Sequence, residues 1–169
     1  MKWELAIKSN RRGKILGSSL ILSLFLFFLL SSRPRLLLLD QEYKRLADFR
    51  PEDFSIIYTH SVERTDVREN YRIEAGKIIL TDTYFSSYGA GLPATTKDDF
   101  EITEDGFHIY NIDREFEEVI YRSGKKLANH RLLIGEKEYR LSDFNRPAQL
   151  IRFTVEKLPR WKTYIGGER

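Results

Sequence analysis

An uncharged apolar run over residues 15–32, ILGSSLILSLFLFFLLSS, constrains this chain more than any other part of its sequence. As an α-helix, a run of this length would extend roughly 27 Å, close to the hydrocarbon thickness of a bilayer. Residues 1–14 hold five basic side chains, whereas only Arg33 and Arg35 follow the run closely. This bias predicts a transmembrane anchor at residues 15–32, a cytoplasmic basic segment at 1–14 and an extracytoplasmic remainder.

A cleavable signal peptide would share the basic start and the short apolar run. Signal peptidase requires small residues one and three positions before the cut. Cuts after Ser32 and Ser31 both put a leucine at the third position, and Pro34 lies just beyond them. We therefore expect an uncleaved, single-pass anchor in the cell membrane, and both interpretations put the domain outside the cytoplasm.

The charge of the chain is divided unevenly between this segment and the rest. The sequence has 28 basic and 25 acidic side chains, of which residues 1–35 hold seven and one. The following residues are mildly acidic, with 21 basic and 24 acidic side chains, which disfavours nucleic-acid binding. The chain has no cysteine, which excludes lipid attachment at a cysteine, thiolate catalysis and cysteine-ligated zinc.

Residues 36–158 have the pattern of a β-rich domain. Runs rich in β-branched and aromatic residues predict strands, at residues 54–60, 77–86, 107–112, 116–121 and 150–155. Glycine-containing turn signals separate them, at residues 74–77, 104–106, 123–124 and 135–137. We expect an all-β fold, an antiparallel β-sandwich or open barrel. A strand hairpin over residues 36–49 is favoured over a helix there, and residues 159–169 form a C-terminal tail.

Three elements follow one another in the chain: His60-Ser61-Val62-Glu63, then Glu69, then Tyr88-Gly89-Ala90-Gly91-Leu92-Pro93. In them the chain resembles an uncharacterised bacterial family, domain-of-unknown-function family 1850, and the resemblance covers most of residues 36–153. Genes of that family tend to lie beside those of TAXI-type TRAP transporters, which combine an exported solute-binding protein with a membrane permease. The resemblance implies an accessory role at such a transporter, with one of these subunits as partner, and it names no catalytic residue.

The first element continues an apolar strand face. Period two puts alternate residues on one side: Phe54, Ile56, Tyr58, His60 and Val62. One interpretation is a buried His60 hydrogen-bonded to Glu69 or to a backbone carbonyl, because a buried polar group needs a partner. The other has His60, Glu63 and Glu69 around a pocket or metal ion, which requires the strand to bend, since Glu63 otherwise faces the opposite way.

Ser61 and the glycine-rich element have structural and functional interpretations too. Ser61 lacks the Gly-x-Ser-x-Gly setting of a hydrolase nucleophile, and its neighbour His60 points the opposite way on a strand. Gly89 and Gly91 permit positive φ, and Pro93 fixes the exit of a tight loop. This loop is either structurally demanding or, with Tyr88, a recognition surface; it lacks the features of a phosphate cradle.

Three functions of different classes fit these features. The first is a membrane-tethered interaction module that docks a transporter component, since a tether makes even weak docking effective. The alternatives are a small-solute-binding module and a metal-assisted hydrolase. We favour the first and expect no enzyme activity, no cofactor and no bound metal. The candidate binding residues are His60, Ser61, Glu63, Glu69, Tyr88, Gly89, Gly91 and Pro93.

Overall fold

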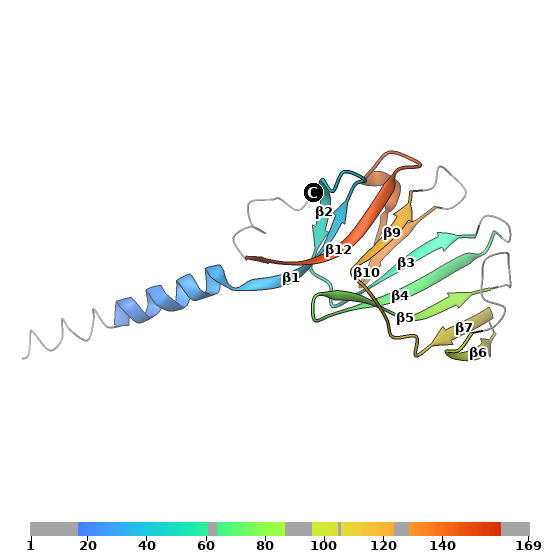
Figure 1. Ribbon diagram of the computed structural model, residues 1–169, viewed down its shortest axis with the longest axis horizontal. Coiled ribbons are helices and arrows are strands. Elements are labelled where there is room, and N and C mark those ends of the chain that lie inside the picture. The colour runs from blue at the N-terminus through green and yellow to red at the C-terminus, as the bar shows by residue number, and fades with distance from the viewer. Residues whose placement is uncertain (1–16, 61–63, 87–95, 105, 124–128, 160–169) are drawn as a thin grey trace, which may run out of the picture. The chain divides into compact units, whose positions relative to one another are not determined.

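Two antiparallel β-sheets account for most of the chain that the structure, a computed structural model, describes (Figure 1). The described residues are 17–60, 64–86, 96–104, 106–123 and 129–159. The mostly-β, antiparallel class predicted from the sequence is therefore confirmed, with one helix ahead of the sheets. The predicted cytoplasmic segment at 1–14 and nearly all of the predicted tail at 159–169 lie outside the described residues.

The helix at residues 17–30 lies inside the predicted anchor. Its apolar side chains are exposed, with 74% exposure for Phe27 and 70% for Ile21. Within the described ranges, no helix combines the length and the hydropathy that crossing a membrane requires. The chain divides into two compact units, and the helix belongs to a different unit from residues 34–156.

The larger sheet has eight strands, and seven of them follow the order β11-β10-β3-β4-β5-β7-β6, while β8 pairs with β5 beside this path. Their bounds are β3 (Asp53–Thr59), β4 (Asp66–Glu74), β5 (Lys77–Phe85), β6 (Asp99–Thr103), β7 (Gly106–Tyr110), β8 (Arg114–Phe116), β10 (Arg131–Ile134) and β11 (Lys137–Arg140). Between β4 and β5, φ is 52° at Ala75 and 86° at Gly76. This is the tight hairpin geometry that the turn signal at residues 74–77 predicts.

The smaller sheet has the order β2-β1-β12-β9. Its strands are β1 (Ser32–Leu39), β2 (Arg45–Phe49), β9 (Glu118–Arg122) and β12 (Leu150–Pro159), with a short 3-10 helix, η1 (Leu141–Asp143), ahead of β12. β1 and β2 pair antiparallel, which confirms the predicted hairpin over residues 36–49. β1 and β12, the first and last of the described strands, are neighbours in this sheet.

The predicted strand runs match single strands in four of five cases, at β3, β5, β7 and β12. The run over residues 116–121 is different, because the backbone bends at Glu117. β8 ends before the bend and pairs with β5, whereas β9 begins after it and pairs with β12. The predicted strand is thus two strands in different sheets. The apolar pattern does not predict β4 and β6, since charged side chains fill many of their positions.

The main hydrophobic core is built by both sheets. Its fully buried side chains include Leu36, Leu38, Ile151 and Phe153 from the smaller sheet, and Ile56, Ile78 and Leu132 from the larger one. Burial of one such side chain contributes about 1.5–3 kcal/mol to folding. A second cluster of Val67, Phe85 and Ile109 extends the core side of the larger sheet to β7.

Arg35 is part of the folded domain. Its side chain is 2% exposed and forms an ion pair with Asp48 of β2, which is 7% exposed. The sequence interpretation treats Arg35 as a charge flanking the apolar run. In the structure it is a buried side chain of the smaller sheet, and Asp48 pairs with both Arg35 and Arg45.

A β-bulge in β5 decides which of its side chains face the core. The register between β4 and β5 shifts so that Thr81 is an extra residue between Leu80 and Asp82. Leu80 belongs to the main core, whereas Asp82 contacts Asn70 on the opposite, outer face of the larger sheet. Without the bulge, Leu80 and Asp82 would face the same way, since side chains alternate with period two.

Candidate functional site

The strands that precede the two motif elements in the chain, β3 and β5, finish at the same end of the larger sheet. Thr59, the last residue of β3, pairs with Asp66, and Phe85, the last residue of β5, pairs with Val67. The element His60–Glu63 follows β3 in the chain, and the glycine-rich element follows β5. β3 and β5 therefore end side by side with the start of β4, and we call this end of the sheet the motif end.

His60 closes the turn that follows β3. Its backbone N–H donates to the carbonyl of Thr65 at 2.8 Å, and its own carbonyl accepts from the N–H of Arg64 at 2.9 Å. Arg64 adopts a positive φ of 56°, which is uncommon for a residue with a side chain. The backbone at His60 is thus fixed by hydrogen bonds on both sides, and its side chain is half-buried.

Glu69 is a carboxylate on the core side of β4, opposite Ile56 of β3. Its Oε2 accepts a hydrogen bond from the Tyr71 hydroxyl at 3.0 Å and another from the Tyr121 hydroxyl. The two hydroxyl oxygens lie 2.7 Å apart, and the Tyr58 ring centroid is 6.2 Å from that of Tyr121. We call Glu69 and these three tyrosines the Glu69 cluster. Because Tyr121 lies on β9, the cluster links the two sheets.

The phenols of the Glu69 cluster stay protonated. Burial is the main cause that raises the pKa of Tyr58, Tyr71 and Tyr121 far above the ordinary value of 10.0, and the negative charge of Glu69 raises each pKa further. Desolvation and a nearby carboxylate both disfavour a phenolate. The three hydroxyls are therefore hydrogen-bond donors at neutral pH, which suits them to hold a carboxylate and does not suit them to attack a substrate.

His130 packs against the Glu69 cluster just before β10. Its ring centroid is 5.4 Å from that of Tyr58 and 5.6 Å from that of Tyr121. Burial lowers the pKa of His130 below its ordinary value of 6.5, so its ring is neutral near pH 7. Its Nδ1 is buried and has no hydrogen-bond partner within the described part of the chain. Protonation of this ring is therefore costly in the folded state.

The structure describes two of the predicted binding residues, His60 and Glu69. The other six lie outside the described residues: Ser61, Glu63, Tyr88, Gly89, Gly91 and Pro93. Of the His, Asp and Glu side chains that the structure describes, no three are grouped so that they could hold a metal ion. The hydroxyl groups around Glu69, one of them from the other sheet, are partners that the sequence pattern does not predict.

A second polar group lies on the outer face of the larger sheet. Arg68 donates from Nε to Asn70 Oδ1 at 3.0 Å and from Nη2 to Ser55 Oγ at 3.3 Å. Ser55 Oγ donates to the same Asn70 oxygen at 2.6 Å, and Asn70 Nδ2 donates to Asp82 Oδ1 at 2.6 Å. Both ends of the Asn70 amide are thus bonded, which fixes its orientation. We call Ser55, Arg68, Asn70 and Asp82 the outer-face network.

Polar contacts continue from the outer-face network to the edge of the sheet. His108 of β7 has Nε2 3.5 Å from Asp82 Oδ1 and Nδ1 2.8 Å from Glu101 Oε1 of β6. Its ring stacks on Tyr84 of β5, with centroids 3.9 Å apart and planes 7° apart. Side chains from β3, β4, β5, β7 and β6 are therefore connected across one face, which orders this surface without assembling a nucleophile and base pair.

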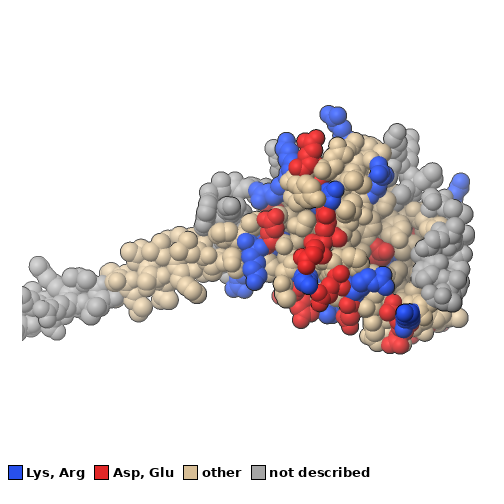
Figure 2. Space-filling view, viewed as in Figure 1, with Lys and Arg blue, Asp and Glu red and all other residues tan. Residues whose placement is uncertain are grey.

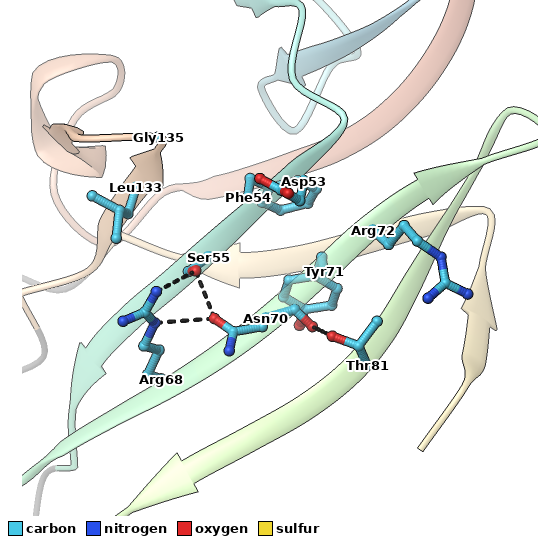
Figure 3. Close-up of a pocket in the computed structure, with 10 residues that line it drawn as sticks. All are labelled: Asp53, Phe54, Ser55, Arg68, Asn70, Tyr71, Arg72, Thr81, Leu133 and Gly135. Atoms are coloured by element: carbon cyan, nitrogen blue, oxygen red, sulfur yellow. Dashed lines mark hydrogen bonds between the residues drawn. The ribbon is translucent and has the colours of Figure 1, made fainter. Parts of the chain in front are cut away.

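A cavity of about 420 Å³ opens at the outer-face network (Figure 3). Ser55 and Asn70 lie between Arg68 on one side and Asp53 and Arg72 on the other, and Leu133 of β10 adds an apolar side. Sites for small molecules typically have volumes of about 300–1,000 Å³ and a few fixed polar groups. The cavity is therefore large enough to take a small solute.

Arg68 differs from several other arginines of the domain in how its charge is balanced. On the face shown in Figure 2, Lys and Arg side chains lie among Asp and Glu side chains. Arg72, Arg131 and Arg152 each form ion pairs with carboxylates. Arg68 is held by a neutral amide and a neutral hydroxyl, and none of the carboxylates that the structure describes forms an ion pair with it. Its positive charge is available at the cavity.

A family model described as a domain of unknown function, DUF1850, matches residues 54–141, a little over half of the chain. The chain belongs to the DUF1850 family. This confirms the resemblance based on the His60–Glu63 and Tyr88–Pro93 elements. No curated protein and no solved structure matches the chain. The DUF1850 match begins in β3 and ends just after β11, so it spans the larger sheet and β9 and leaves β1, β2 and β12 outside.

Part of the outer-face network of this DUF1850 domain can be recognised from the spacing of residues in the sequence. Arg68, Asn70 and Arg72 are spaced by two along β4, so period two puts them on one side, although Glu69 interrupts the apolar pattern of the other side. Asp82 follows no such pattern, because the bulge at Thr81 changes the alternation within β5. Once β4 is known to be a strand, this spacing gives its polar face, whereas it does not give the connection to Asp82.

Proposed function

We propose that this DUF1850 protein is a membrane-anchored, non-enzymatic accessory module that acts outside the cytoplasm and binds a subunit of a TAXI-type TRAP transporter. In this proposal the two antiparallel sheets form a β-sandwich held at the cell membrane by the uncleaved N-terminal helix. Membership of the family supports the transporter link, through the gene neighbourhood that the resemblance implies.

The N-terminal segment supports the membrane location. The helix at residues 17–30 has exposed apolar side chains and no charged residue, and five basic residues precede the apolar run. A strong excess of basic residues before an apolar segment favours a cytoplasmic N-terminus.

The observation that carries the proposal is an apolar patch on the edge strand β6. Ile102 is 76% exposed and Phe100 is 38% exposed, and we call these two residues the β6 edge patch. β6 stands at the end of the strand order in the larger sheet, so one side of its backbone faces away from β7. Open edges with apolar side chains are typical docking sites, since they can pair with a strand of another chain.

The test is a pull-down of the tagged full-length protein from native membranes, in the wild type and in two variants. Ile102→Asp puts a charge in the β6 edge patch. Ile120→Asp is the matched control, because Ile120 is also an exposed isoleucine, at 46%, on β9 at the edge of the smaller sheet. Substitution of exposed side chains changes stability by less than about 0.5 kcal/mol in most cases, so both variants should fold.

We expect transporter subunits to accompany the wild type and Ile120→Asp, and to be lost with Ile102→Asp. Transporter subunits that remain with Ile102→Asp would refute the role of the β6 edge patch. Absence of any transporter subunit from the wild-type sample would refute the accessory role itself. Recovery of the wild type in the soluble fraction would refute the anchor.

A small-solute-binding module is the second candidate function, and the cavity at the outer-face network favours it. The cavity lies on the face of the sheet where Arg68, Asn70 and Ser55 are already ordered by hydrogen bonds. A protein that holds a solute close to a permease could serve the same transporter. The two functions use different surfaces, so they can be tested separately.

A further inference from the structure

We propose that the cavity at the outer-face network binds a small solute through a carboxylate group, with Arg68 as the residue that recognises it. This inference rests on the second proposed function, solute binding, and names the chemical class of the solute. It is carried by the position of Arg68 at one end of a cavity of about 420 Å³, with Ser55 and Asn70 beside it (Figure 3).

Arg68 is held in place before any ligand arrives. Its Nε and Nη2 donate to Asn70 Oδ1 and Ser55 Oγ, and Ser55 is 7% exposed, so it is a rigid partner. Asn70 is fixed in turn by Asp82 and by Ser55. A guanidinium has more N–H donors than these two bonds use. A side chain ordered in this way loses little entropy when a ligand binds.

The partners of Arg68 leave its charge unneutralised. An arginine that serves only to stabilise a sheet surface would gain most from a carboxylate partner, as Arg152 does with Glu118 at 2.6 Å. Arg68 instead contacts an amide and a hydroxyl. Arginine matches a planar carboxylate with two parallel hydrogen bonds, which gives both affinity and geometry. The observed arrangement therefore fits a carboxylate that comes from outside the chain.

The far end of the cavity favours a solute that also carries an amino group. Asp53 lies there, two residues from Ser55 along β3, or roughly 7 Å. Asp53 is exposed and makes no ion pair among the side chains that the structure describes. Arg72, which lies opposite Asp53 and also lines the cavity, has its charge balanced by Glu74 and Asp113. A carboxylate at this point attracts a cation and repels a second carboxylate. A zwitterion with its carboxylate at Arg68 and its ammonium group near Asp53 fits both ends.

The test is calorimetric titration of the full-length protein in detergent micelles with four probes: L-glutamate, succinate, glucose and putrescine. Arg68→Gln removes the charge, and Arg68→Lys keeps it but removes the planar fork. Arg140→Gln is the matched control, because Arg140 is an exposed arginine on β11 of the same sheet. Asp53→Asn tests the far end of the cavity. Thermal unfolding of each variant verifies that it folds.

We expect L-glutamate to bind the wild type and Arg140→Gln alike. Arg68→Gln should weaken that binding about 10- to 100-fold, since hydrogen bonds to charged groups are lost, and Arg68→Lys should weaken it less. Asp53→Asn should weaken the binding of L-glutamate and leave the binding of succinate unchanged or tighter. Equal affinity of L-glutamate for the wild type and Arg68→Gln would overturn the inference. Binding of glucose or putrescine alone would also overturn the inference of a carboxylate ligand, whereas the proposed function of solute binding would be supported. Absence of binding by all four probes would overturn both.

Discussion

At the scale of single residues, Glu69 has the most consequential position. Its carboxylate lies on the core side of β4 and accepts hydrogen bonds from tyrosines of both sheets. Removing one partner from a half-buried carboxylate is costly, because the charge is left without its donors. The Glu69 cluster therefore fixes how β4 and β9 meet near the motif end.

His130 predicts how stability depends on pH. Burial lowers the pKa of His130 below its ordinary value of 6.5, so the unfolded chain binds a proton more readily than the folded one. The free energy of unfolding should therefore be highest above pH 6.5 and fall as the pH drops through and below this value. Urea unfolding followed by circular dichroism from about pH 8 to 5 measures the decrease.

The variant His130→Phe isolates this contribution. A phenyl ring keeps the stacking on Tyr58 and Tyr121 and cannot be protonated. The slope of the unfolding free energy against pH should be smaller in His130→Phe, by less than about 1.4 kcal/mol per pH unit, the limit for one proton. Equal slopes in the two proteins would show that His130 is not the titrating group.

Sequence periodicity predicts which side chains share a face, but only within one strand. It puts Phe54, Ile56 and Tyr58 on one face, and the structure has Phe54 and Ile56 in the main core with Tyr58 packed against it. The partner of Glu69 on the other sheet, Tyr121, is 52 residues away in the chain. Which distant side chain meets Glu69 depends on how two sheets are stacked, and no local pattern contains that information.

At the scale of elements, β5 shows why a correct strand prediction can still misassign its faces. The run at residues 77–86 predicts β5 correctly, but strict alternation would put Leu80 and Asp82 on one side. The extra residue Thr81 separates them, and its hydroxyl donates to the carbonyl of Asn70 at 3.1 Å. Bulges depend on the register between two strands. They cannot be predicted from either strand alone.

The hairpin between β6 and β7 gives a prediction at the same scale. Gly106 has a φ of 140°, and a Cβ added there would lie 2.4 Å from the carbonyl oxygen of Phe85. Gly106→Ala should lower the free energy of unfolding by about 2–4 kcal/mol, through backbone strain and the steric conflict with β5. Thermal or urea unfolding measures the loss.

Gly76→Ala is the matched control for this prediction. Gly76 also has a positive φ, of 86°, but a Cβ there would meet nothing within 4 Å. Gly76→Ala should lower the free energy of unfolding by on the order of 1 kcal/mol, from backbone strain alone. If the two variants lose the same stability, close packing against Phe85 is not what requires glycine at position 106.

At the scale of the whole molecule, the boundaries of the family match differ from those of the folded unit. Residues 54–141 contain the larger sheet and β9 but lack β1, β2 and β12. A fragment of residues 54–141 would expose the core faces of Ile56, Ile78 and Leu132. We expect it to aggregate, and we expect a fragment of residues 34–159 to unfold cooperatively.

Amide NMR spectra and thermal unfolding of the two fragments test this expectation. The longer fragment should have dispersed amide resonances and a single sigmoidal transition, because both sheets cover the core. A folded, monomeric 54–141 fragment would show that the smaller sheet is dispensable. In that case the family boundaries would also be those of the stable unit.

The pairing of β1 with β12 has a consequence for the order of events during synthesis. β1 ends at Leu39 and β12 begins at Leu150, so the ribosome must add more than a hundred residues before the two can meet. At about 5–20 residues per second, β1 lacks this neighbour for on the order of ten seconds. Its apolar positions Leu36 and Leu38 have only β2 beside them during that time. The domain therefore completes its core only late in translation, after β12 has been made.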